Sequence, residues 1–131
     1  MKPICLHDKT EIEVFFRHDS FLHIYEIGDL DEFFWPYTTW YAIKNNGDIK
    51  AVALVYTNCD LPVLVALSDD NRSPMSQLLE SLVPFLPRCF DAHLSLGLET
   101  IIEDRYESDS HGLHYKMALK DSSLLTRVNT S

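Results

Sequence analysis

Basic residues are scarce in this sequence. The 131 residues include 11 Lys and Arg against 20 Asp and Glu, which leaves a formal net charge of −9. Proteins that bind nucleic acid draw much of their affinity from Lys and Arg placed at phosphates. Anionic membrane surfaces attract the same cations. The charge balance therefore argues against nucleic acid and membranes as partners.

Cysteine and long apolar runs are scarce as well. The three cysteines, Cys5, Cys59 and Cys89, are an odd number with no close spacing that suggests a pair. Residues 1–7 contain no apolar stretch long enough for a signal peptide, and no run approaches the length of a membrane-spanning helix. This pattern predicts reduced, mostly buried thiols in a cytoplasmic protein.

The composition is that of an ordinary globular domain, with 46% hydrophobic and 24% charged residues. A chain of this length can bury a core without disulfides or metal. We expect one domain over residues 1–120. Residues 121–131 are rich in Ser, Thr and Asn, which predicts a linker or frayed tail. No residues along the chain form an obvious catalytic set.

Aromatic residues crowd into residues 28–41, which hold six of the fifteen Phe, Trp and Tyr. We name five of these positions the aromatic corner: Trp35, Tyr37, Thr38, Trp40 and Tyr41. It can be a packed helix-to-strand corner, a docking surface for a partner domain, or a ligand pocket with aromatic walls and hydroxyl groups. The acidic residues beside it can attract a cationic amine or form a solvated turn: Glu26, Asp29, Asp31 and Glu32.

The first half of the chain predicts two helices and a three-stranded meander. Asp8 begins a helix that runs to about Arg17, and Asp19 or Ser20 begins a second over residues 21–27. The expected strands are 40–44, 49–56 and 63–67. Asn46-Gly47 joins the first two strands, because both residues accept the positive φ of a type I′ turn. Residues 63–67 are apolar at successive positions, as in a strand covered on both faces.

The second half alternates helices and strands. Ser73 as cap and Pro74 at the first helical position open a helix that ends at Pro84 and Pro87. A strand at 89–94, a short helix at 98–105 and a last strand at 114–119 follow. The order α-α-β-β-β-α-β-α-β predicts an α/β fold, an α+β sandwich built on a mixed sheet.

Two pairs of residues that contain histidine come into question for proton transfer or metal binding. Asp91 and His93 are two apart on a predicted strand and so share a face. They can form a proton-transfer pair, half of a metal site, or a structural hydrogen bond. His111 and His114 are three apart, fall on opposite faces of one strand, and are not expected to share a metal. The segment Cys5-Leu6-His7 is expected to be mobile.

The element order resembles the GNAT N-acetyltransferase fold. Short local segments resemble, more narrowly, the N-terminal half of a bacterial two-part GNAT-family protein. The resemblance covers about residues 20–120 and rests on these segments: 24–42, 61–64, 86–87, 93–95, 97–99 and 114–117. In such proteins a second GNAT module follows and carries the acyl-CoA site.

The resemblance implies that this module does not hold CoA. A working GNAT module carries an Arg/Gln-x-x-Gly-x-Gly/Ala turn whose backbone N–H groups bind the pyrophosphate. Residues 68–74 occupy that turn here without a glycine, and Asp69 and Asp70 would face the anion. A carboxylate about 4 Å from a phosphate charge costs about 1 kcal/mol in water and about four times that near a protein surface. No cofactor is expected for this chain, and acetyl-CoA is expected for the second module.

The family's catalytic groups are also poorly represented. The family often uses a Glu base on the fourth strand, but residues 63–67 contain no acid. Tyr106 is the nearest candidate for the family's Tyr acid, and its alternative is a packing residue with its hydroxyl in water. The candidates for a catalytic role are Tyr106, Asp91 and His93, and none of them matches the family's pattern.

The resemblance thus predicts a non-catalytic N-terminal domain of a longer N-acetyltransferase, with a structural, acceptor-side or oligomerisation role. Its partners would be the C-terminal GNAT module or a second copy of itself. GNAT sheets often splay, so the strand edge near residues 115–119 and the aromatic corner are the expected contacts. The alternatives are a self-contained small acetyltransferase with an atypical cofactor loop and a free-standing protein-interaction module.

Overall fold

The computed structural model describes residues 3–19, 23, 26, 30–31, 34–57, 60–69, 71–111 and 114–120. The strands are β1 (Ile4–Leu6), β2 (Thr38–Asn45), β3 (Asp48–Tyr56), β4 (Val63–Ala66), β5 (Cys89–Leu94), β6 (Tyr106–His111) and β7 (His114–Leu119). The helices are α1 (Lys9–Phe16), α3 (Ser73–Leu82) and α4 (Glu99–Ile102), with 3₁₀ turns η1 (Arg17–Asp19), η2 (Trp35–Tyr37) and η3 (Val83–Phe85).

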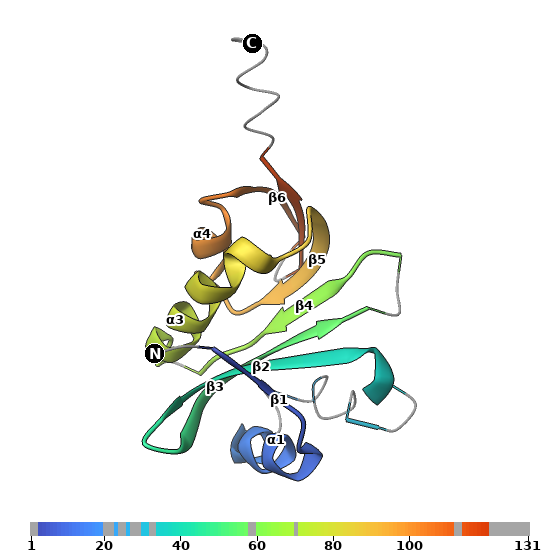
Figure 1. Cartoon of the computed structure of the whole chain (residues 1–131). Helices are drawn as coiled ribbons and strands as arrows, with labels where there is room; N and C mark the ends of the chain where they lie inside the picture. The colour runs from blue at the N-terminus through green and yellow to red at the C-terminus, as the bar shows by residue number, and fades with distance from the viewer. Residues whose placement is uncertain are drawn as a thin grey trace, which may run out of the picture.

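The described residues form one seven-stranded mixed sheet in the order β1-β2-β3-β4-β5-β7-β6, with α1 on one face and α3 and α4 on the other (Figure 1). This architecture is mixed α/β and compatible with the expected α+β class. The second predicted helix, at 21–27, lies outside the described residues except for His23 and Glu26. The predicted tail at 121–131 lies wholly outside them. Within the described chain, no helix is both long and apolar enough to cross a membrane.

The N-terminal segment is a strand, so the prediction of a mobile terminus is wrong. β1 pairs antiparallel with β2 and places Leu6 opposite Trp40. Asp8 then caps α1 as predicted, because its Oδ1 accepts the backbone N–H groups of Thr10 at 2.9 Å and Glu11 at 3.3 Å. A three-residue edge strand is too short to show a two-residue periodicity, which is why the sequence did not reveal it.

The β2–β3–β4 meander is confirmed. Asn46 and Gly47 have φ values of +55° and +84°, the left-handed pair that a type I′ hairpin requires. A register shift between Ile43 and Lys44 marks a bulge near this turn. β4 then pairs antiparallel with β3 on one side and parallel with β5 on the other, so the sheet changes direction at β4.

Helix α3 crosses over between the parallel strands β4 and β5. Its buried side chains recur at helical spacing: Met75, Leu78, Leu79, Leu82 and, in η3, Val83. Ser73 is the first helical residue and Arg72 takes the cap position without a side-chain cap bond, so the predicted serine cap is wrong. Pro84 ends the regular helix in a 3₁₀ turn, because a proline inside a helix has no N–H to donate.

Strand β6 is not among the predicted elements, and the predicted edge of the sheet is wrong. β6 pairs antiparallel with β7, and β7 lies between β5 and β6. The expected exposed edge at residues 115–119 is therefore an interior strand, although Leu119 is 37% exposed. The β6 sequence YESDSH has one large apolar residue, Tyr106, and so lacks an apolar alternation. Helix α4 is also shorter than the predicted 98–105.

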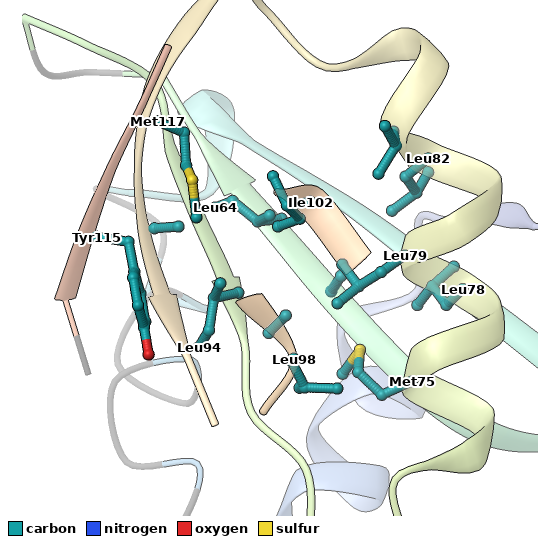
Figure 2. Close-up of a cluster of buried hydrophobic side chains, with 14 of the residues drawn as sticks. Leu64, Met75, Leu78, Leu79, Leu82, Leu94, Leu98, Ile102, Tyr115 and Met117 are labelled. Atoms are coloured by element: carbon teal, nitrogen blue, oxygen red, sulfur yellow. The ribbon is translucent and has the colours of Figure 1, made fainter. Parts of the chain in front are cut away.

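Two apolar clusters sandwich the sheet. The larger one joins α3 and α4 to one face, and Figure 2 shows the α3 side chains directed toward those of β4, β5 and α4. Phe90, Tyr106, Tyr115 and Met117 extend it to the β5–β7–β6 side of the sheet. The smaller cluster joins α1 to the other face of β1–β4: Leu6, Ile12, Phe16, Leu30, Trp40, Ala42, Val52, Leu54 and Val65.

Leu79→Ala is expected to lower the free energy of unfolding by about 2–5 kcal/mol, because Leu79 is fully buried and its loss leaves a cavity. Leu96→Ala is the matched control, since Leu96 is 70% exposed and the change should stay within about 0.5 kcal/mol. Urea denaturation of the two variants measures both. Equal losses would contradict the placement of α3 over the larger cluster.

Candidate functional site

One half of the α1 side of the sheet is polar. Strand alternation places Asp91 and His93 of β5 on the same face as His114 and Lys116 of β7, because Asp91 is opposite Lys116 and His93 is opposite His114. The apolar cluster under α1 reaches only as far as β4. His93 and Lys116 are exposed, and Asp91 and His114 are half-buried. We name these four residues the open face.

The two imidazole rings of the open face are stacked. Their centroids are 4.8 Å apart and their planes differ by 10°. His114 Nε2 lies 3.7 Å from Asp91 Oδ1, which is close for an ion pair but too long for a hydrogen bond. Asp91 Oδ1 is buried and has no hydrogen-bond partner. An unpaired buried carboxylate oxygen is costly, so this atom is available to a donor that approaches it.

The environment of His93 opposes its protonation. Partial burial lowers the pKa of His93 and the neighbouring His114 lowers it further, while Asp91 acts in the opposite direction. A stacked pair of imidazoles resists protonation of both rings because the two positive charges would lie close together. His93 therefore takes up a proton less readily than an ordinary histidine does.

The structure confirms one of the two predicted pairs and places the other across two strands. Asp91 and His93 do share a face as predicted, and β7 adds His114, which the sequence analysis did not join to them. His111 and His114 do not lie on one strand: they are opposite each other on β6 and β7. His111 and His114 are separated by two residues, Gly112 and Leu113, which is the spacing of a two-residue hairpin turn. Among the described side chains, no group of three or more His, Cys, Asp or Glu is arranged to hold a metal ion.

Tyr106 is buried rather than at a helix end with its hydroxyl in water. It begins β6, is 2% exposed, and packs its ring edge-on against Phe90 with centroids 5.2 Å apart. Its hydroxyl lies 2.8 Å from the Pro87 carbonyl oxygen and 3.1 Å from that of Leu86 and donates to them. Burial also raises the pKa of Tyr106. This hydroxyl ties β6 to the segment after η3.

Three residues of the aromatic corner come together. Trp40 is 1% exposed, and its Nε1 donates to Thr38 Oγ1 at 2.7 Å. Thr38 Oγ1 in turn donates to the Trp35 carbonyl oxygen at 2.7 Å. The Trp35 and Trp40 rings stack with centroids 6.1 Å apart. These bonds lock the η2 turn onto the start of β2.

The other two members of the corner point elsewhere. Tyr37 is 41% exposed and packs its ring against Tyr56. Tyr41 is half-buried on the α3 side of the sheet, where burial raises its pKa. The corner therefore forms no single five-residue pocket. A hollow of about 250 Å³ does lie beside it, lined by Leu6, His7, Trp35, Pro36, Thr38, Thr39 and Trp40.

The turn from β4 to α3 is held by its own polar groups. Asp69 Oδ1 accepts the Asn71 N–H at 2.9 Å, and the Arg72 guanidinium donates to the carbonyl oxygens of Ser68 at 2.9 Å and Asp69 at 3.2 Å. Ser95 Oγ accepts the Ser68 N–H at 2.9 Å, which joins the ends of β4 and β5. Asp70 lies outside the described residues.

A small cavity of about 40 Å³ lies where this turn meets α1 and β3. His23 lines it and belongs to a buried pair, with its Nδ1 3.0 Å from Glu26 Oε2. Glu26 is fully buried, so it is not part of a solvated acidic turn, and burial raises its pKa. The Phe16 ring lies 4.6 Å from the His23 ring. The sequence does not indicate this buried pair, because a His and a Glu three residues apart are equally typical of an exposed helix face.

Two cysteines depart from expectation. Cys5 and Cys89 are both exposed free thiols, not buried ones. Cys5 lies on the edge strand β1, and Cys89 is the first residue of β5. Cys59 lies outside the described residues.

No protein-family model, no curated protein and no solved structure matches this chain. The function is therefore argued from the geometry above.

Trp40→Ala is expected to lower the free energy of unfolding by about 3–5 kcal/mol, because a large buried ring and its hydrogen bond are lost together. Trp35→Ala should cost less, since Trp35 is only half-buried. Denaturation midpoints of the two variants decide this. A loss below about 1 kcal/mol for Trp40→Ala would make the corner a surface feature.

The lowered pKa of His93 predicts a pH-dependent stability. The folded protein binds this proton less tightly than the unfolded chain, so stability is full above the ordinary histidine pKa of about 6.5 and falls as the pH drops through it. Urea midpoints between about pH 8 and pH 5 should fall less steeply for His93→Gln than for the unchanged chain. His18→Gln, at an exposed site, is the control. Identical slopes for all three proteins would contradict the effect.

Proposed function

We propose that this chain is the N-terminal, non-catalytic GNAT-like domain of a longer acyl-CoA-dependent N-acetyltransferase. The order of elements supports the proposal: a β2–β3–β4 meander, a central helix α3, strand β5, helix α4 and two closing strands. The N-terminal strand β1 and the strand β6 are additions to the predicted order. Its role is to complete the fold, to form part of the acceptor side, or to pair protomers.

The observation that carries the proposal is the turn from β4 to α3. The pyrophosphate of CoA needs bare backbone N–H groups, and glycines let it approach them. Residues 68–74 contain no glycine. The one cation of the turn, Arg72, donates to backbone carbonyl oxygens of the turn, and the carboxylate of Asp69 binds a backbone N–H there. The residues present do not fit the pyrophosphate.

Hydrogen bonds join the ends of β4 and β5. The two strands pair in parallel from Val63 to Ala66, and the Ser95 hydroxyl bonds both the N–H and the carbonyl oxygen of Ser68 beyond them. Strand ends joined in this way support a structural role for the module.

The candidate tyrosine is committed to the fold. The Tyr106 hydroxyl donates to carbonyl oxygens of the segment after η3, so it is not free to protonate a leaving group. β4 carries no acid or base, since its residues are Val63, Leu64, Val65 and Ala66. Neither of the family's two usual catalytic groups is therefore available at its expected place.

A protein-interaction module is the second candidate, and two exposed apolar side chains favour it. Phe85, the last residue of η3, is 81% exposed, and Leu96, between β5 and α4, is 70% exposed. Both are large apolar groups that a second GNAT module or a second copy of the chain can cover. A self-contained acetyltransferase remains the other alternative and differs from both in requiring CoA binding.

Titration calorimetry with acetyl-CoA tests the proposal. We expect no heat of specific binding at moderate salt, because the turn offers no anion cradle. A dissociation constant at or below about 10 μM, roughly −7 kcal/mol, would favour the self-contained enzyme instead. An active GNAT enzyme in the same buffer is the positive control. Asp69→Ala is the matched variant: if the unchanged chain binds, removal of this carboxylate should tighten binding when the ligand lies at this turn.

A further inference from the structure

Two residues of a metal-binding type, His93 and His114, face each other on the open face. His93 and His114 occupy directly opposite positions on β5 and β7, and their rings stack with centroids 4.8 Å apart. The neutral imidazole is the commonest metal ligand in proteins. His93 is exposed and His114 half-buried, so an ion can reach both from solvent.

The two rings must turn out of their stack to share an ion. Their centroids are 4.8 Å apart and their planes are near-parallel, so the nitrogen lone pairs point along near-parallel lines. At a tetrahedral ion, two Zn–N bonds of about 2.0–2.1 Å place the nitrogens about 3.3 Å apart, with each lone pair directed at the ion. His93 is exposed, so rotation about its side-chain bonds brings one of its nitrogens to an ion beside His114.

Asp91 stands where a metal-binding histidine needs a carboxylate. Such a histidine usually donates its second ring N–H to a carboxylate or carbonyl oxygen, which fixes the tautomer and the ring orientation. Asp91 Oδ1 lies 3.7 Å from His114 Nε2 and has no hydrogen-bond partner. If Nε2–H donates to Asp91, Nδ1 of His114 is left with its lone pair for a metal.

The charges around the pair favour a cation. Lys116 lies between Asp91 and Asp109 in the neighbouring row of the sheet, which sets two carboxylates against one ammonium group. His111 is opposite His114 on β6 in the backbone register, in the same row as His93. Three histidine positions thus follow one another across β5, β7 and β6.

We propose that His93 and His114 bind a divalent transition-metal ion such as Zn²⁺ across β5 and β7, with Asp91 as the positioning residue that orients His114. The two imidazoles form the chelate, and water completes the coordination. A two-imidazole chelate binds less tightly than a closed structural zinc site with four protein ligands. This site is independent of the proposed acetyltransferase role, because it lies outside the β4–α3 turn.

Calorimetric titration with ZnCl₂ tests the site. Because zinc also binds thiolates and Cys5 and Cys89 are exposed, all three cysteines are first changed to serine. In this background we expect a dissociation constant of about 10–100 μM near pH 7.5. His93→Ala and His114→Ala should each raise it at least about tenfold, and Asp91→Asn should raise it by a smaller factor, up to about tenfold. His18→Ala is the matched control and should change it less than about twofold.

Three outcomes would overturn the proposal. The first is a dissociation constant for zinc above about 1 mM in the background protein. The second is an unchanged zinc affinity in the His93→Ala/His114→Ala double variant. The third is a loss of zinc affinity in His18→Ala as large as that in His93→Ala. Unchanged affinity in Asp91→Asn would remove the positioning role. Should a variant fail to fold, the imidazole NMR signals of the background protein decide the matter. Zinc should shift the signals of His93 and His114 and leave those of His7 and His18 in place.

Discussion

Burial of β4 on both faces is the constraint on which the rest of the structure depends. Leu64 and Ala66 face the α3 cluster, while Val65 belongs to the cluster under α1. A strand without a solvent face needs cover on both sides, so the helix near the N-terminus and the helix in the middle of the chain must reach opposite faces. The parallel pairing of β4 with β5 also demands a crossover, and α3 supplies it over one face. The fold is thus a sandwich whose centre is a four-residue strand.

The two faces of the sheet are covered to different extents, and this difference decides where the polar side chains lie. On the α3 and α4 side the apolar cluster extends from β2 to β6. On the α1 side it stops at β4, and the outward positions of β5 and β7 carry Asp91, His93, His114 and Lys116. Polar side chains are tolerated there because water reaches them. The ionisable groups that can act on a ligand therefore gather on the half of the sheet that α1 leaves open.

Several residues with reactive side chains serve the fold. The Tyr106 hydroxyl holds the segment after η3, Ser95 joins the ends of β4 and β5, and Arg72 binds the carbonyl oxygens of its own turn. In the aromatic corner, Thr38 links the two tryptophans through one hydroxyl. These bonds satisfy polar groups that burial would otherwise leave unpaired. They also occupy the Tyr106 hydroxyl and the Arg72 guanidinium, which supports the proposed structural role.

Local patterns determined most of the elements. Asn46-Gly47 specified its hairpin because few residue pairs accept two positive φ values, and Asp8 specified the start of α1 because its carboxylate can bind the first N–H groups. The apolar stripe of α3 was likewise readable at helical spacing. The sequence did not reveal β1 and β6, since one is three residues long and the other is mostly polar. Such edge strands form because a neighbour already offers unpaired backbone groups.

The candidate site was half readable from sequence. Asp91 and His93 could be joined because a strand places residues two apart on one face, a relation that needs no partner. His114 could not be joined to them, because that contact depends on which strand lies beside β5 and in what register. The burial of Tyr106 and Glu26 and the exposure of Cys5 and Cys89 likewise follow from how elements distant in sequence pack. The sequence by itself determined the elements with strong local preferences. Only the tertiary structure decided the strand neighbours, because strand pairing joins backbone groups that are interchangeable from one residue to the next.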